Sequence, residues 1–265
     1  MKQYASKSTT YYKTFNKMLE DAAARYGSKI AITTYDRKGN VREKSYEDIC
    51  RDAFAFARAL YVHGLAGSHV AIVGENSYDW LVAYMGTAAA GSTAVCIDIE
   101  HTDDIVLEMV RQAKAAAVVA SEVMADLCTA LVKDVGDIRM LIVIGSAPSA
   151  GISLDEFMKC DSDSARLWQE SFTPDGGNIA SIVYTSGTTS TAKPVMLSHQ
   201  AILYNAADSL TLLDSRDKVF NSLPLYHTYG LTCGVLCAFI RGLNICISCD
   251  MKRMLQEMTL FRPGM

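Results

Sequence analysis

The sequence predicts an α/β fold in which mostly parallel sheets are flanked by helices. Half of the 265 residues are apolar and 20% are charged, which gives the chain enough material for a large buried core. Short, nearly continuous apolar runs recur from about residue 69 to residue 184, and segments with helically spaced apolar residues separate them. Strands buried on both faces produce such runs, and the intervening helices are typical of right-handed crossovers between parallel strands.

Before this repeating region, the chain predicts a helix, a hairpin and a second helix. Apolar residues share one face of a helix over about 14–26. Two segments, 29–35 and 41–44, flank the sequence Asp-Arg-Lys-Gly-Asn, which is typical of a hairpin. Ser45 and Asp48 have the spacing of a capping box, which predicts the start of the second helix.

The rest of the chain predicts strands and helices in alternation. Apolar runs predict strands at 69–73, 93–97, 116–120, 140–144 and 179–184, and helical spacing predicts helices at 78–90, 102–113 and 122–133. After a hydroxyl-rich loop and a short strand at 195–197, Ser198 is expected to cap a helix that reaches about Leu210. The remaining strands are predicted at 217–222 and 244–248, and the remaining helices at 229–240 and 252–260.

Composition and charge exclude several classes of function. The 25 basic and 29 acidic side chains give a net charge of −4 and are interspersed, so no nucleic-acid-binding surface is expected. Residues 1–13 lack the apolar core of a secretory signal, and eight cysteines are too sparse for a disulfide-stapled scaffold. The longest uncharged run, 219–240, contains proline, histidine and glycine, which favours buried structure over a membrane span. We therefore expect a cytoplasmic protein with reduced cysteines, for which a peripheral membrane contact stays open.

The strongest chemical signal is the segment 184–193, YTSGTTSTAK. Its hydroxyl groups, Gly187 and the closing Lys193 are suited to surround phosphate oxygens, at a point where open α/β sheets leave crevices. A solvated Ser/Thr turn is the alternative that composition alone leaves open. A Walker-type loop has the same Gly187–Lys193 spacing, but Ala192 and Pro194 replace its second glycine and its magnesium-binding hydroxyl, which argues against it.

The segment 184–199, YTSGTTSTAKPVMLSH, resembles the signature of the adenylate-forming enzymes, a superfamily that includes the AMP-forming acyl-CoA synthetases. Ser190, Ala192 and Pro194 stand where the family has glycine, proline and glycine. Four other elements resemble family elements in the expected order: SYEDI at 45–49, HVAIVGENSYDW at 69–80, GSTAVCID at 91–98 and NSLPLYHTYG at 221–230. The match is with the N-terminal part of these enzymes, and the chain resembles long-chain fatty acid–CoA ligases in particular.

The resemblance implies ATP-dependent activation of a carboxylic acid, in particular a fatty acid, to acyl-AMP and then to acyl-CoA. ATP, Mg²⁺ and coenzyme A are the cofactor and co-substrates that this reaction uses. Adenylation of an aryl or amino acid is one alternative, and a non-catalytic nucleotide-binding module is another.

The resemblance also implies which residues form the site. His227 and Lys193 are the catalytic candidates, because His227 would orient the carboxylate of the acid and Lys193 would follow the phosphates. Without the resemblance, His227 would be read as a half-buried loop histidine. No metal-ligating residue is assigned. The expected nucleotide-binding residues are Thr185, Ser186, Gly187, Thr188, Thr189, Ser190 and Lys193.

The resemblance further implies how the chain is divided. Residues 67–198 would form one lobe, and residues 1–66 would join 199–265 in a second, incomplete one. We expect residues 1–265 to be a truncated N-terminal AMP-binding domain that does not complete the reaction alone. Its expected partners are the carboxylic acid and the missing C-terminal portion of the same polypeptide. Apolar surface left uncovered by that portion would favour self-association.

Four cysteines near the end of the sequence invite a metal site, but their surroundings favour another interpretation. Cys233 and Cys237 lie in one apolar run and Cys246 and Cys249 in the next, and neither pair sits on the tight turns of a zinc ribbon. We therefore expect these cysteines to belong to a buried helix and a buried strand.

Overall fold

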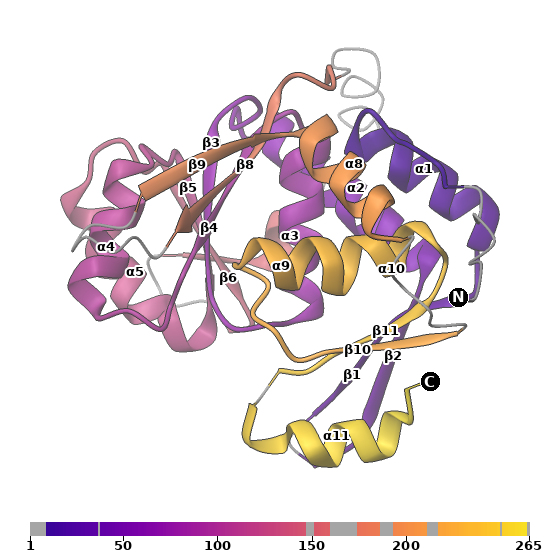
Figure 1. Ribbon diagram of the computed structural model, residues 1–265. Coiled ribbons are helices and arrows are strands. Elements are labelled where there is room, and N and C mark those ends of the chain that lie inside the picture. The colour runs from indigo at the N-terminus through magenta and orange to yellow at the C-terminus, as the bar shows by residue number, and fades with distance from the viewer. Residues whose placement is uncertain are drawn as a thin grey trace.

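The computed structural model describes residues 9–36, 38–146, 151–159, 174–185, 193–210, 217–249 and 251–263. Within them the chain forms a larger and a smaller sheet, with helices between and around them (Figure 1). The predicted α/β class, with mostly parallel sheets flanked by helices, is confirmed.

The larger sheet holds the repeating region of the sequence. Its strands are β3 (His69–Val73), β4 (Thr93–Ile97), β5 (Ala117–Ser121), β6 (Met140–Ile144), β7 (Ile152–Ser153), β8 (Ile179–Thr185) and β9 (Lys193–Ser198). In the described part of the chain they take the order β7-β6-β5-β3-β4-β8-β9. Neighbours run parallel except for β8 and β9, which are antiparallel.

Both faces of the larger sheet are buried, which explains its unbroken apolar runs. Val70 and Ile72 of β3 point into a core shared with α3 (Tyr78–Ala89). The residues between and after them, Ala71 and Val73, belong to a second core. That second core lies under α4 (Asp103–Gln112) and α5 (Ala125–Asp134), and a 3₁₀ turn over Glu122–Met124 leads into α5. Alternate residues of one strand therefore serve opposite helix layers.

The smaller sheet joins segments that are far apart in the sequence. It contains β1 (Ile30–Tyr35), β2 (Val41–Ser45), β10 (Lys218–Asn221) and β11 (Asn244–Ile247), in the order β10-β11-β1-β2. β1 and β2 form the predicted hairpin, and β10, β11 and β1 run parallel. The division into lobes at residues 66 and 198 stays a prediction.

The remaining helices begin where the sequence predicts. α1 (Phe15–Tyr26) starts after Thr14, and α2 (Tyr46–Val62) starts with the complete capping box of Ser45 and Asp48. The Ser198 hydroxyl accepts a hydrogen bond from the backbone N–H of Ala201 and so caps α8 (His199–Ser209). A 3₁₀ turn over Met251–Arg253 leads into the final helix, α11 (Met254–Phe261).

Two details differ from the sequence prediction. The helix expected over 229–240 is interrupted: α9 (Thr228–Leu231) passes into a π-helical segment, Thr232–Leu236, and then into α10 (Cys237–Ile240). The strand β7 and the one-turn helix α6 (Leu154–Phe157) were not predicted, because two-residue and four-residue elements are too short to show a period.

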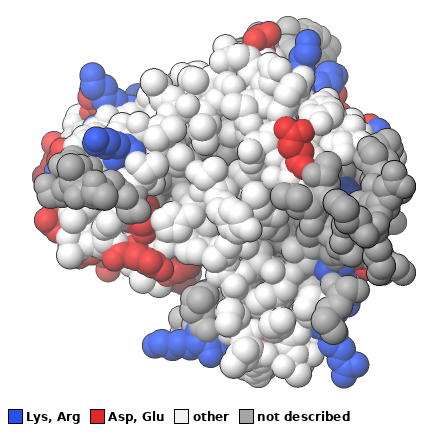
Figure 2. Space-filling model, viewed as in Figure 1, with Lys and Arg blue, Asp and Glu red and all other residues white. Residues whose placement is uncertain are grey.

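The charged side chains in view in Figure 2 lie mainly at the rim of this face of the molecule. Its middle is uncharged and lies over α9 of Figure 1, whose Tyr229 is 69% exposed.

Because His199 is buried, we expect the free energy of unfolding to fall measurably in acid. Its ring is fully buried, its Nδ1 accepts from the backbone N–H of Phe15 at 3.4 Å, and burial lowers its pKa from 6.5 to about 4. Between these values the unfolded chain binds a proton that the folded chain excludes, so stability falls as the pH drops. The loss amounts to about 3 kcal/mol by pH 4. Urea denaturation at pH 7 and pH 4.5 should give a smaller pH difference for His199→Gln than for the wild type; equal differences would contradict this assignment.

Candidate active site at the carboxyl ends of two sheets

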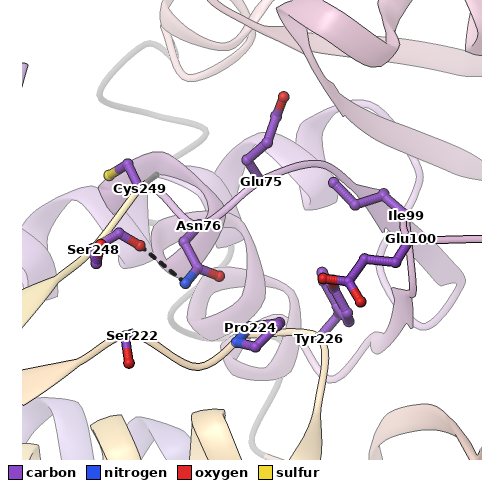
Figure 3. Close-up of a pocket in the computed structure, with 9 residues that line it drawn as sticks. All are labelled: Glu75, Asn76, Ile99, Glu100, Ser222, Pro224, Tyr226, Ser248 and Cys249. Atoms are coloured by element: carbon purple, nitrogen blue, oxygen red, sulfur yellow. Dashed lines mark hydrogen bonds between the residues drawn. The ribbon is translucent and has the colours of Figure 1, made fainter. Parts of the chain in front are cut away.

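A pocket of about 200 Å³ lies where the carboxyl ends of strands from both sheets meet (Figure 3). Its lining residues follow the strand ends directly: Glu75 and Asn76 after β3, Ile99 and Glu100 after β4, Ser222, Pro224 and Tyr226 after β10, and Ser248 and Cys249 after β11. Open parallel sheets bind their ligands at this edge, because the connecting loops diverge there and leave a crevice.

Asn76 ties the two sheets together beside the pocket. Its Nδ2 donates to the carbonyl oxygens of Leu223 and Ser248, at 2.9 and 3.1 Å. Its Oδ1 accepts from the backbone N–H of Leu225 at 2.8 Å. Figure 3 shows the bond from Asn76 to Ser248. The amide thereby fixes the segment 222–227, which carries the predicted catalytic histidine.

His227 is presented by that segment as a half-exposed side chain. Leu225 and Tyr226 before it are buried, and they anchor the backbone. The His227 side chain is 45% exposed, and its Nε2 lies 3.8 Å from Oδ2 of Asp98. The Tyr226 ring meets the imidazole edge-on, with 4.9 Å between the ring centroids. The ring of His227 therefore lies beside the carboxylate of Asp98 and the ring of Tyr226; Tyr226 lines the pocket, and His227 is not among its lining residues.

Two carboxylates shape the electrostatics of this region. Burial raises the pKa of the Tyr226 phenol above its ordinary value, and the negative charges of Asp98 and Glu100 raise it further. The phenol therefore stays protonated and neutral at physiological pH. Figure 3 shows Glu100 and Tyr226 on the same side of the pocket.

The two ends of the predicted phosphate loop lie at the same sheet edge. Thr185 ends β8 and pairs with Lys193, which begins β9, and both side chains are exposed. Val183 of β8 pairs with Cys96 of β4, so Thr185 and Asp98 each lie two residues beyond that pair. The predicted nucleotide-binding residues Ser186, Gly187, Thr188, Thr189 and Ser190 lie outside the described residues.

A family model described as AMP-binding enzyme matches residues 19–262. The chain belongs to this family. It is 27% identical over 248 residues to a long-chain-fatty-acid–CoA ligase of Bacillus subtilis, a match that covers 83% of this chain and 43% of that protein. The chain spans less than half the length of the curated relatives that it matches first.

Solved structures show the same fold. A long-chain-fatty-acid–CoA ligase from Archaeoglobus fulgidus superposes with a TM-score of 0.78 at 20% identity, covering 99% of this chain and 52% of that one. An anthranilate CoA ligase in complex with anthranoyl-AMP gives a TM-score of 0.79 at 19% identity, covering 96% and 49%. The predicted membership of the adenylate-forming enzymes and the predicted fold are both confirmed.

In this chain the structure brings some predicted site residues together and adds others. The described contacts join Thr185 to Lys193 and His227 to Asp98. Sequence reasoning assigned no role to Asp98, and it could not show the contacts of Asn76 with the smaller sheet. The available signal for Asp98 was its position directly after an apolar strand, where polar residues of parallel sheets reach the carboxyl edge.

Two further observations concern the cysteines and the membrane. Cys237 and Cys246 are buried, and burial raises the pKa of each thiol to about 12, so both stay protonated.

Among the residues that the structure describes, no three His, Cys, Asp or Glu side chains are grouped to hold a metal ion. In the same residues, no helix has the length and apolar character that crossing a membrane requires.

Proposed function

We propose that the intact protein activates a carboxylic acid with ATP to give acyl-AMP and pyrophosphate, and then transfers the acyl group to coenzyme A. Family membership and the likeness to a long-chain-fatty-acid–CoA ligase support this proposal. The single observation that carries it is a convergence at the carboxyl edge of the larger sheet: His227, from the segment after β10, meets Asp98 after β4, and β4 neighbours β8, the strand that ends at Thr185.

The proposed reaction has two steps. A carboxylate oxygen attacks the α-phosphorus of ATP, and the bond to the bridging oxygen breaks so that pyrophosphate leaves. The thiol sulfur of coenzyme A then attacks the acyl carbonyl carbon, loses its proton, and displaces AMP. Bound together with ATP, Mg²⁺ would supply neutralisation of part of the phosphate charge.

The chain's own residues would position the reactants and balance charge, which is most of what such phosphoryl chemistry requires. Lys193 and the hydroxyls from Thr185 to Ser190 would hold the phosphates of ATP. His227 would donate a hydrogen bond to the carboxylate and orient it toward the α-phosphorus. Leu225 and Tyr226, the two buried residues before the histidine, would keep its backbone fixed.

A fatty acid is the substrate class we favour, because the Bacillus subtilis relative is named as a long-chain-fatty-acid–CoA ligase. An aryl acid is the second candidate, since the anthranilate CoA ligase has the same fold and the described pocket is lined by polar as well as apolar residues. Comparing the two classes of acid in one assay separates these candidates.

The test is acid-dependent exchange of labelled pyrophosphate into ATP by the full-length protein. Exchange should require a carboxylic acid, and fatty acids should support it better than aryl or amino acids. His227→Ala should lower the exchange rate roughly tenfold to a hundredfold. His63→Gln is the matched control, because His63 caps the C-terminus of α2 and stacks on Phe157. The proposal would be refuted if the wild-type protein showed no pyrophosphate exchange with any carboxylic acid tested. An exchange rate of His227→Ala equal to that of the wild type would also refute it.

A further inference from the structure

The carboxylate of Asp98 lies against two imidazoles. Its Oδ2 is 3.8 Å from Nε2 of His227 and 3.6 Å from Nε2 of His101. The Asp98 side chain is only 15% exposed, whereas the imidazoles of His227 and His101 are 45% and 35% exposed. The carboxylate is therefore the sheltered member of the group, and the histidines are the members that reach solvent.

The backbone fixes the direction of this carboxylate. Oδ1 of Asp98 accepts from the backbone N–H of Glu100 at 2.9 Å. That bond occupies one oxygen and leaves Oδ2 directed at the histidines. Asp98 directly follows β4, an interior strand of the larger sheet in which every residue is buried, so the backbone that carries the carboxylate is held rigidly.

We infer that Asp98 is the positioning residue for His227. Its Oδ2 would accept the Nε2–H of His227, which fixes the rotation of the ring and turns Nδ1 toward the acid; Nδ1–H donates to the carboxylate when both ring nitrogens carry a proton. The inference rests on the proposed function, since it concerns the atom that His227 presents to the acid. A small shift of the 222–227 segment on substrate binding would shorten the 3.8 Å separation to a hydrogen bond.

His101 serves as an internal comparison, because it faces the same oxygen from the loop of Asp98 itself. If Asp98 acts on catalysis through His227, removing His101 leaves Oδ2 available to His227. His101→Gln should then retain the exchange rate of the wild type within about twofold.

The deciding experiment is a double-mutant cycle on the full-length protein with Asp98→Asn and His227→Ala. Asparagine keeps an acceptor for the N–H of Glu100, but it presents an NH₂ group to the imidazole in place of an acceptor. Asp98→Asn alone should lower the maximal exchange rate about tenfold and leave the KM for ATP unchanged. In the His227→Ala background the same change should have no further effect.

The outcomes separate this inference from the proposed function. A fully active Asp98→Asn protein, a tenfold effect that persists without His227, or a change confined to the KM for ATP would each overturn the inference and leave the proposed function standing. A wild-type protein without acid-dependent exchange would overturn the proposed function, and the inference with it. Thermal unfolding midpoints of Asp98→Asn and the wild type should agree; a large drop would assign Asp98 a structural role instead.

Discussion

Replacing Gly230 by alanine is expected to displace the segment that carries His227 and to abolish exchange. A Cβ atom at Gly230 would lie 2.3 Å from the carbonyl oxygen of Pro224 and 3.0 Å from Cβ of Leu223. The nearest obstacle is backbone, so the change requires α9 and the 222–227 segment to separate. We expect a loss of about 3 to 5 kcal/mol in the free energy of unfolding, in the range of the most damaging core substitutions.

Urea denaturation and the exchange assay measure the two consequences of Gly230→Ala together. Gly136 provides a matched control, because a Cβ atom there would meet nothing within 4 Å. Gly136→Ala should be neutral or slightly stabilising, by less than about 1 kcal/mol. If both alanine variants unfold at the same urea concentration, the close packing of α9 against Pro224 is wrong.

Replacing Asn76 by aspartate should separate the two sheets at the pocket. The carboxylate would face the carbonyl oxygens of Leu223 and Ser248, to which the Asn76 amide now donates. Both carbonyl oxygens would lose the Asn76 donor and meet a negative charge instead, although that of Leu223 would keep the bond from Asn221 Nδ2. The N–H of Leu225 would keep an acceptor. We expect a loss of about 3 kcal/mol and at least tenfold slower exchange.

Asn205→Asp is the control for this charge change, because Asn205 lies on the exposed face of α8. A surface substitution of this kind should alter stability by less than about 0.5 kcal/mol. Equal stability of Asn76→Asp and the wild type would show that the amide does not hold the 222–227 segment.

The elements that the sequence predicts well are those whose signal is local. The Ser45 capping box needs only residues three apart, and the strand at 69–73 is apolar throughout because both of its faces are covered. Each of these features is set by neighbours in the chain, so the periodicity and the cap residues locate them within one or two positions.

The features that the sequence does not predict depend on contacts between distant segments. Ile32 pairs with Ile245 in the smaller sheet, and no local pattern selects that partner. The π-helical segment after α9 accompanies a close approach, since a Cβ atom at Gly234 would lie 2.4 Å from the side chain of Asn221.

The site residues also fall into those with a local sequence signal and those that depend on contacts between distant segments. His227 and Lys193 could be selected from motifs, because each stands in a contiguous run of family residues. Asp98 comes from a different strand end, and its contact with His227 arises only when the carboxyl edge of β4 meets the segment after β10. Spatial convergence of this kind follows from sheet order, which a single sequence does not contain.

The most direct test of the proposed site is the structure of the full-length protein with a non-hydrolysable acyl-sulfamoyl adenosine, which mimics acyl-AMP. The sulfamoyl group is predicted to lie at the carboxyl edge of the larger sheet, between the Thr185–Lys193 strand ends and the imidazole of His227. A ligand seated at the amino ends of the strands, or one in contact with none of His227, Thr185 and Lys193, would contradict the assignment.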